Sequence, residues 1–333
     1  MKCTAPLAAF DERPYGGAIK IVGKSYDSVR KIKPHPHAHK IELPCGQCTA
    51  CRIKRSREWA VRMTHEAQMT TGGCSFITLT FNKESLERRK RPMSLDVKEF
   101  QDFMKRLRER IKKPIRFFHC GEYGELRKRP HYHAIIFGHD FDDREMVRKG
   151  NQHELPLYKS AQLESLWPYG FSSVGEAQYE SMAYVARYVT KKITGDCSKE
   201  HYQYFDMETG EYLYDRDPEY CTMSRRPGIG QQWFLKYGKT DVIPHDYVVV
   251  YNGESQFKAA VPRYYDSLIE KYENLGGPNK LNEVKIKRRE KLYESFEDVT
   301  QEDYKKRLDV LEEVNRLKMT RLMRKMDEEN GIF

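Results

Sequence analysis

The chain of 333 residues has no long apolar run. No window approaches the ~18 consecutive apolar residues that a membrane-spanning helix needs, so we do not expect an integral membrane protein. The first ten residues hold only a short apolar run, too weak for a secretory signal. Internal repeats and low-complexity segments are also lacking. Aromatic residues make up 12% of the chain, which argues against wholesale disorder and favours a soluble protein with a buried core.

Acidic residues are too few to balance the basic ones. There are 49 Asp and Glu against 59 Lys and Arg, which gives a formal net charge of +10. A basic surface is typical of proteins that bind a polyanion such as nucleic acid, although it can also serve solubility alone. Composition leaves both interpretations open.

Cysteine is too sparse for a secreted disulfide framework, which is usually dense in a short chain. The chain has eight cysteines, and we expect reduced thiols in a cytoplasm. Cys45, Cys48 and Cys51 cluster as C-x₂-C-x₂-C, and Cys3 could supply a fourth thiolate to a closed structural zinc site. Zinc proteins usually pair two separated C-x₂-C units, so a cluster of reduced thiols near a helix start is the alternative. The nearby histidines 35, 37 and 39 read as a polar loop.

The order of expected elements predicts an α+β protein with a mostly antiparallel central sheet and flanking helices. The first ~50 residues read as extended or looped. The expected elements are a helix from Cys51, a strand at 74–81, a helix from Ser94 that ends before Pro114, strands at 115–120 and 131–137, a helix at 179–192, a strand at 247–251 and a charged helical tail from about Leu281. We expect three segments, namely a cysteine-containing segment with a basic helix (1–70), a central domain (71–240) and a C-terminal extension (241–333).

His131 and His133 flank Tyr132 on one of these strands. Alternate strand side chains share a face, so the two imidazoles lie about 7 Å apart at the backbone, which suits two ligands of one metal. Glu122 precedes His131 by nine residues, and a hairpin could bring its carboxylate alongside; Glu125 is the rival for this third position. Two imidazoles and a carboxylate suit Mg²⁺ or Mn²⁺ in phosphoryl chemistry. A pair of packed or surface histidines is the alternative.

The helix at 179–192 carries two phenols and an ammonium on one side. Helical spacing places Tyr184, Tyr188 and Lys191 opposite an apolar face formed by Met182, Val185, Ala186 and Val189. We therefore expect the phenols to point away from the core of the helix. Tyrosine oxygen can attack a phosphodiester that a metal has made electrophilic, and a nearby cation stabilises the charge. Half-exposed tyrosines without a chemical role are the alternative.

A histidine–hydrophobic–histidine strand followed by a tyrosine helix resembles the HUH endonucleases that initiate rolling-circle replication. Three ordered motifs carry the likeness: Phe76-Ile-Thr-Leu-Thr80, Arg129-Pro-His-Tyr-His133 and Tyr184-Val-Ala-Arg-Tyr188-Val-Thr-Lys191. Other stretches are similar to replication initiators of the gokushovirus branch of the Microviridae: Pro44-Cys-Gly-Gln-Cys48, Phe118-His-Cys-Gly-Glu-Tyr-Gly124, Leu166-Trp-Pro-Tyr-Gly170 and Met223-Ser-Arg-Arg-Pro-Gly-Ile-Gly230. The motifs do not cover the tail beyond about Leu281.

The resemblance implies an HUH fold and a metal-dependent nickase that acts on single-stranded phage origin DNA. His131, His133 and Glu122 would hold the metal, Tyr188 would attack first, and Tyr184 would act when the unit-length strand is cut and rejoined. The attack would leave a 5′-phosphotyrosine link and a free 3′-OH for host polymerase, with a host helicase, in the host bacterial cytoplasm. A plasmid or transposon HUH nickase is the nearest alternative. A non-catalytic single-stranded DNA binder is the alternative from another class.

A basic helix after the cysteines is the candidate DNA contact. It carries Arg52, Arg55, Arg57, Trp59 and Arg62, which would track phosphates in the origin-nicking interpretation. The other interpretation is a solvated amphipathic face. Gly228-Ile-Gly230 lacks the third glycine and preceding strand of a nucleotide-binding loop, so we expect a turn there.

Overall fold

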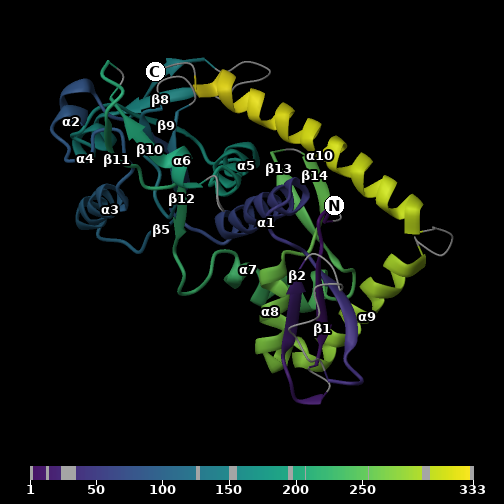
Figure 1. Ribbon diagram of the computed structural model, residues 1–333. Coiled ribbons are helices and arrows are strands. Elements are labelled where there is room, and N and C mark those ends of the chain that lie inside the picture. Colours follow the sequence, from purple (N-terminus) through teal and green to yellow (C-terminus); the bar gives the residue numbers. More distant parts are fainter. Residues whose placement is uncertain are drawn as a thin grey trace. The chain divides into compact units, whose positions relative to one another are not determined.

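The computed structural model (Figure 1) describes residues 3–12, 15–23, 35–124, 128–149, 156–193, 198–206, 208–253, 255–294 and 301–330. The chain folds as two compact units. The first comprises Met1–Arg55 with Phe296–Lys325, and the second comprises Ser56–Ser295 with Met326–Phe333. The helix α1 (Thr49–Gln68) begins in the first unit and continues into the second.

The first unit contains a small antiparallel sheet that the sequence analysis did not predict as strands. Its order is β2-β1-β3, with bounds β1 (Leu7–Asp11), β2 (Ile19–Gly23) and β3 (His39–Leu43). Ala8, Ala9 and Phe10 in the central strand are buried. The long helix α10 (Gln301–Asn330) belongs to the same unit, although more than 250 residues separate it from β3.

A seven-stranded sheet forms the centre of the second unit, and all of its pairings are antiparallel. Its order is β12-β5-β6-β4-β9-β8-β7, with bounds β4 (Cys74–Leu79), β5 (Arg116–Tyr123), β6 (Pro130–Phe137), β7 (Arg144–Arg148), β8 (Leu157–Ser160), β9 (Ser172–Glu176) and β12 (Tyr220–Met223). The predicted α+β class with a mostly antiparallel sheet is confirmed.

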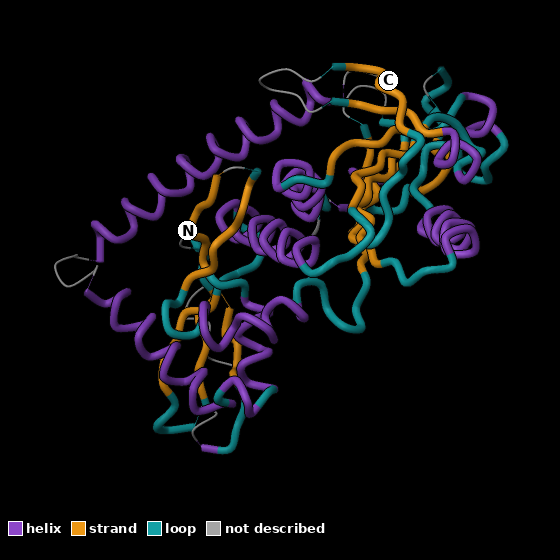
Figure 2. The backbone as a smooth tube through the Cα atoms, turned by 180° about the vertical axis from the view of Figure 1, so that it is seen from behind, coloured by secondary structure: helices purple, strands orange, loops and turns teal. Residues whose placement is uncertain are grey.

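Helices cover both faces of this sheet (Figure 2). On one face, α3 (Val97–Ile111) and α4 (Ala161–Leu166) pack Phe100, Leu107 and Leu163 against strand residues such as Ile77. On the other face lie α1 and α5 (Tyr179–Arg187), which η3 (Tyr188–Thr190) extends. The helix α3 starts later than predicted because Asp96, rather than Ser94, caps it by accepting a hydrogen bond from the Lys98 N–H.

A second core in the same unit joins the segments on both sides of residue 240. It includes Val61, Trp233, Phe234, Val248 and Tyr265, all of which are buried. These residues come from α1, α7 (Gln231–Tyr237), β13 (Tyr247–Asn252) and α8 (Arg263–Lys271). The remaining elements are α2 (Lys83–Glu87), α6 (Ser198–Tyr202), β10 (Gln203–Phe205), β11 (Tyr212–Asp215), η4 (Gly238–Val242), β14 (Ser255–Ala260), η5 (Glu273–Leu275) and α9 (Gly277–Glu294). The expected boundary at 240 therefore runs through a shared core.

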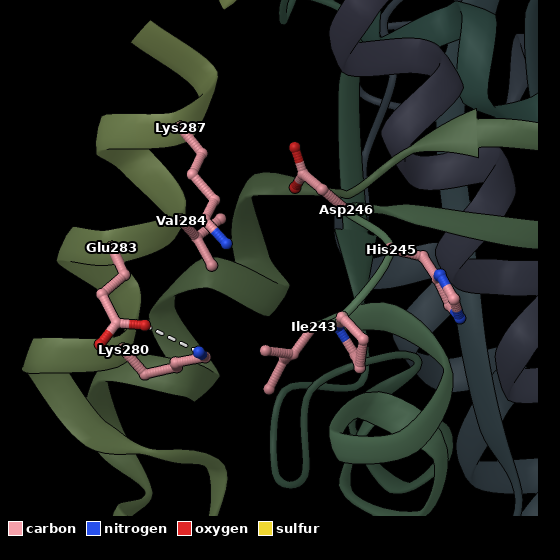
Figure 3. A pocket seen from close by; sticks show the side chains of 8 residues that line it. Ile243, His245, Asp246, Lys280, Glu283, Val284 and Lys287 are labelled. Atoms are coloured by element: carbon pink, nitrogen blue, oxygen red, sulfur yellow. Dashed lines mark hydrogen bonds and ion pairs between the residues drawn. The ribbon is translucent and has the colours of Figure 1, made fainter. Parts of the chain in front are cut away.

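A pocket of about 240 Å³ lies between α9 and the turn that precedes β13 (Figure 3). Its lining includes His245, Asp246, Lys280, Glu283 and Lys287. Lys280 and Glu283 form an ion pair of 2.7 Å across one side. The lining carries charges of both signs, so the pocket does not select one kind of charged ligand.

Buried His65 should make the second unit less stable at acidic pH. Its ring stacks on Trp233 at 3.5 Å between centroids and contacts the Tyr265 hydroxyl at 2.8 Å. Burial lowers the pKa of His65 to about 3, below the ordinary value near 6.5. The unfolded chain takes up the proton first as pH falls, so stability is lost between pH 6.5 and 3.

From pH 7 to pH 5 we expect this residue to lower the free energy of unfolding by about 2 kcal/mol. Urea denaturation at both pH values measures this change. The same experiment on His65→Gln, which cannot take up a proton, should show a smaller pH dependence. An equal dependence in the two proteins would contradict the assignment.

Candidate active site

Three neighbouring strands place the predicted metal ligands on one face of the seven-stranded sheet. In the pairing of β5 with β6, Glu122 lies opposite His131, and Cys120 lies opposite His133. In the pairing of β4 with β6, Thr78 lies opposite His133. Cross-strand partners point to the same side, so Glu122 and both histidines share the face covered by α5 and η3.

His133 is the centre of a buried hydrogen-bond chain. Its Nδ1 lies 3.0 Å from Thr78 Oγ1, and its Nε2 lies 3.3 Å from Glu122 Oε1. Lys191 Nζ donates to the other oxygen of Glu122 at 2.9 Å. The side chains of His133, Glu122 and Lys191 are 3%, 1% and 7% exposed, so solvent does not screen these contacts.

The charged neighbours of Glu122 overcome the effect of its burial. Burial alone favours the protonated carboxyl, but the hydrogen bond with His133 and the charge of Lys191 lower the pKa of Glu122 below its ordinary value. Glu122 therefore stays ionised, and a buried carboxylate beside an imidazole is a suitable donor for a hard divalent cation.

His131 stands slightly apart from this chain. Its Nδ1 contacts the Arg129 carbonyl oxygen at 2.8 Å, and burial lowers its pKa. Gly124 leaves room for the ring, because a Cβ there would lie 2.8 Å from His131 Cε1. Within the described residues, Glu122, His131 and His133 do not bring all their ligand atoms within 4.8 Å of one another. The rival ligand Glu125 lies outside the described residues.

Both predicted tyrosines are buried against His133, rather than turned away from a core. The Tyr188 ring stacks on the His133 ring at 5.0 Å, and the Tyr184 ring meets it edge-on at 5.4 Å. The Tyr188 hydroxyl donates to the Tyr184 hydroxyl. Burial and the charge of Glu122 raise the pKa of Tyr188 well above its ordinary value. The helical spacing identified the right face, but the helix is packed on both sides, which a single helix pattern does not reveal.

The end of the tyrosine helix also differs from the prediction. The helix α5 stops at Arg187, and Tyr188 begins the short 3₁₀-helix η3, so regular α-helix does not reach residue 192. Lys191 follows η3 directly, with its Nζ 5.1 Å from the centre of the Tyr188 ring. The ammonium therefore lies between the carboxylate of Glu122 and the phenol, as a cation that acts on both would.

Three residues on this face were not identified from the sequence. Thr78 contacts His133 Nδ1, while Cys120 and Cys221 pair across β5 and β12. Strand alternation from His133 through the sheet register would have identified them, but that register requires the order of the strands. Cys120 is fully buried, and this raises the pKa of its thiol well above the ordinary value.

The predicted DNA-contact residues on α1 fall into two groups. Arg55 and Arg57 are exposed, and Arg52 is half-buried. Arg62 lies between the rings of Trp59 and Tyr264, at 3.9 and 4.0 Å from their centres, and its Nε donates to the Ile229 carbonyl at 3.0 Å. Trp59 itself packs on Phe118. Arg62 and Trp59 therefore stabilise the fold, while Arg55 and Arg57 face solvent.

The four cysteines named from the sequence come together in the first unit. The Sγ atoms of Cys3, Cys45, Cys48 and Cys51 all lie within 4.8 Å of one another, so the cluster could hold a metal ion. In the part of the chain that the structure describes, no other group of three or more His, Cys, Asp or Glu residues has ligand atoms this close. His35 and His37 stack with Tyr15 and lie outside this cluster, and His39 begins β3.

Two further sequence expectations can be placed. Gly228 and Gly230 lie in the turn before α7, as predicted, and the Gly230 N–H donates to Glu66 Oε2 at 2.7 Å. Among the helices in the described ranges, none combines the length and apolar character that crossing a bilayer requires.

Comparisons with known proteins agree with the motifs. The family model of the replication-associated protein ORF2 matches residues 74–193, the stretch that contains β4, β5, β6 and Lys191. Replication-associated protein VP4 of Bdellovibrio phage phiMH2K is 30% identical over 270 residues, which cover 78% of this chain and 76% of the relative. No solved structure matches the chain.

Two more relatives show the same level of similarity. Replication-associated protein ORF2 of Spiroplasma virus 4 is 30% identical over 69% of this chain and 68% of the relative. Replication-associated protein ORF4 of Chlamydia phage 1 is 30% identical over 69% of this chain and 54% of the relative. The chain therefore belongs to the family of phage replication-associated proteins, of the Microviridae type that its motifs resemble.

Proposed function

We propose that the chain initiates phage rolling-circle replication by nicking single-stranded origin DNA through a covalent tyrosine intermediate, and that it rejoins the strand afterwards. The observation that carries the proposal is the convergence of Glu122, His133, Tyr184, Tyr188 and Lys191 on one buried face of the sheet. A protein that only stacks bases on aromatic side chains does not need a carboxylate, an imidazole and two phenols in mutual contact.

The donor set suits a Mg²⁺ or Mn²⁺ ion. The Nδ1 atoms of both histidines are engaged, with Thr78 and with the Arg129 carbonyl, which leaves each Nε2 as the ligand atom. Glu122 contributes an ionised carboxylate next to His133. When bound, the cation would polarise the non-bridging oxygens of the scissile phosphate. His131 has to approach the Glu122–His133 pair to complete the set.

Tyr188 is the proposed first nucleophile. Its oxygen forms a bond to phosphorus while the bond from phosphorus to the 3′ oxygen breaks, and the departing oxygen takes up a proton to become a free 3′-OH. Lys191 lies beside the Tyr188 ring and stabilises the charge that develops. The tyrosine ester keeps the energy of the phosphodiester, so rejoining needs no ATP.

Tyr184 is the proposed second nucleophile, used when the displaced strand is cut and closed. Its hydroxyl accepts a hydrogen bond from Tyr188, so the two phenols reach the same phosphate position in turn. Tyr188 is only 1% exposed, and DNA binding therefore has to move the side chains that cover it. In this proposal, host polymerase and helicase extend and unwind from the free 3′-OH in the bacterial cytoplasm.

A denaturing-gel assay tests the proposal with labelled single-stranded oligonucleotides that tile the genome encoding the chain, in the presence of Mn²⁺. We expect one fragment to give a protein–DNA adduct that EDTA abolishes and that the double variant Tyr184→Phe/Tyr188→Phe does not form. Tyr179→Phe is the matched control, because Tyr179 lies on the same helix but contacts Phe257 instead. Binding without any cleavage or adduct would favour the non-catalytic DNA-binding alternative.

Neutralising Arg55 and Arg57 should weaken the salt dependence of DNA binding. Both side chains are exposed on α1, so their loss removes phosphate contacts without disturbing the core. Each lost contact on single-stranded DNA reduces the slope of log affinity against log salt by about 0.7. Fluorescence anisotropy at several salt concentrations measures this slope for Arg55→Gln/Arg57→Gln.

Arg62→Gln provides the comparison within the same helix. Because Arg62 is packed between two aromatic rings, we expect this change to lower the unfolding temperature and to leave the salt slope unchanged. An unchanged slope in the double variant would remove Arg55 and Arg57 from the DNA interface.

A further inference from the structure

The four clustered cysteines have the spacing of a tetrahedral thiolate site. Cys3 Sγ lies 3.6 Å from Cys45 Sγ and 3.7 Å from Cys48 Sγ. Four sulfurs at the usual zinc–sulfur distance of about 2.3 Å lie about 3.8 Å apart at the corners of a tetrahedron. A disulfide would instead bring two sulfurs to about 2.05 Å, and the four cysteines are free thiols. The arrangement therefore already fits zinc.

Backbone N–H groups support the sulfurs as they do around a bound metal. The N–H groups of Gln47 and Cys48 lie 3.4 and 3.2 Å from Cys45 Sγ, and the Cys45 N–H lies 3.3 Å from Cys3 Sγ. Gly46 has a φ of 74°, a left-handed conformation that a glycine adopts readily and that turns these N–H groups towards the sulfur. Such second contacts stabilise thiolates and fix their orientation.

The cluster connects elements that have little other reason to stay together. Cys3 precedes β1, Cys45 and Cys48 follow β3, and Cys51 lies in the first turn of α1. A metal ion bound to all four would fasten both ends of the small sheet to the start of α1.

The helix α10 docks directly beside the same cluster. Glu312 accepts hydrogen bonds from Thr4 and from Thr49, with one carboxylate oxygen for each hydroxyl. Thr4 follows Cys3, and Thr49 follows Cys48, so the two hydroxyls are held by residues next to the cysteines. Along α10, half-buried Leu308 and Met319 lie on the same face as Glu312 and buried Asn315.

We propose that Cys3, Cys45, Cys48 and Cys51 bind one Zn²⁺, and that the bound site holds the C-terminal helix in place by setting Thr4 and Thr49 at the spacing that Glu312 bridges. Binding releases four thiol protons and leaves a closed site with no open coordination position, so its role is structural. Without the metal, Thr4 and Thr49 are no longer fixed relative to each other, and α10 loses its anchor. This role does not depend on the nicking chemistry.

Metal content and helix protection test the two parts separately on the full chain. We expect one zinc per chain after purification in metal-free, reducing buffer, and Co²⁺ substitution should give the absorption of a tetrahedral thiolate site. Cys48→Ser should lose the metal, whereas Cys74→Ser should keep it because Cys74 lies on β4, outside the cluster. Absence of zinc and of a tetrahedral cobalt spectrum would overturn the proposal.

Hydrogen exchange then measures the docking of α10. Removal of the metal should speed amide exchange in residues 306–320 by more than about tenfold. Glu312→Gln should speed exchange in the same residues while the zinc remains bound, which separates loss of docking from unfolding of the metal site. Glu313→Gln is the control, since Glu313 pairs with Arg316 on the exposed side of the helix. Unchanged exchange after metal removal, or equal effects of the two glutamine variants, would overturn the coupling.

Discussion

Glu122→Gln and Lys191→Met should each reduce the rate of covalent adduct formation by at least about 100-fold. Glu122 contacts both His133 and Lys191, so its replacement removes an ionised donor and leaves the ammonium without its carboxylate. Replacement of Lys191 removes the cation beside Tyr188. Single-turnover cleavage of the origin fragment in Mn²⁺ measures both rates. Lys192→Met is the matched control, because the neighbouring Lys192 is exposed.

Stability measurements on the same variants separate chemistry from folding. Each single replacement leaves a buried charge without its partner, which typically costs about 3 kcal/mol. The double variant Glu122→Gln/Lys191→Met removes both charges, so we expect it to lose less stability than the two single losses added together. Its cleavage rate should remain as low as that of either single variant. Recovery of cleavage together with stability would show that the pair serves only the fold.

Glu66→Ala should lower the free energy of unfolding by about 2 kcal/mol, or about 4–8 °C in melting temperature. The Glu66 carboxylate is buried and receives hydrogen bonds from Arg116 and from the Gly230 N–H, and Arg116 also donates to the Pro227 carbonyl at 2.7 Å. One side chain thereby joins α1 to β5 and to the glycine-containing turn before α7. Its removal leaves a partly buried guanidinium and a buried N–H without their acceptor.

Thermal unfolding followed by circular dichroism measures the effect. Glu109→Ala is the control, because Glu109 is an exposed glutamate on α3. An equal change in melting temperature for both variants would show that the contacts of Glu66 contribute no net stability.

The sequence predicted the parts of the site that depend on short-range periodicity. Strand alternation placed His131 and His133 on one face, and a hairpin of the right length brought Glu122 opposite His131. The burial of Tyr184 and Tyr188 could not be predicted in the same way. A helical pattern shows which residues share a side, but only the tertiary structure shows that the sheet covers that side as well.

The elements that were missed carry weak local signals. The strand β9 lies inside the seven-stranded sheet, yet its sequence Ser172-Ser-Val-Gly-Glu176 contains one β-branched residue and a glycine. Its strand conformation depends on pairing with β4, which is distant in sequence. The small N-terminal sheet was read as extended or looped for the same reason, since its strands have five residues each.

The most direct test of the central claim identifies the residue that carries the DNA. Trypsin cleavage after Arg187 places Tyr184 and Tyr188 in different peptides, so mass spectrometry of the digested adduct distinguishes them. We predict that the first cleavage attaches the 5′-phosphate of the DNA to the peptide that begins at Tyr188. Cleavage that releases a free 5′-phosphate and leaves neither tyrosine modified would show that water is the nucleophile, and would contradict the account.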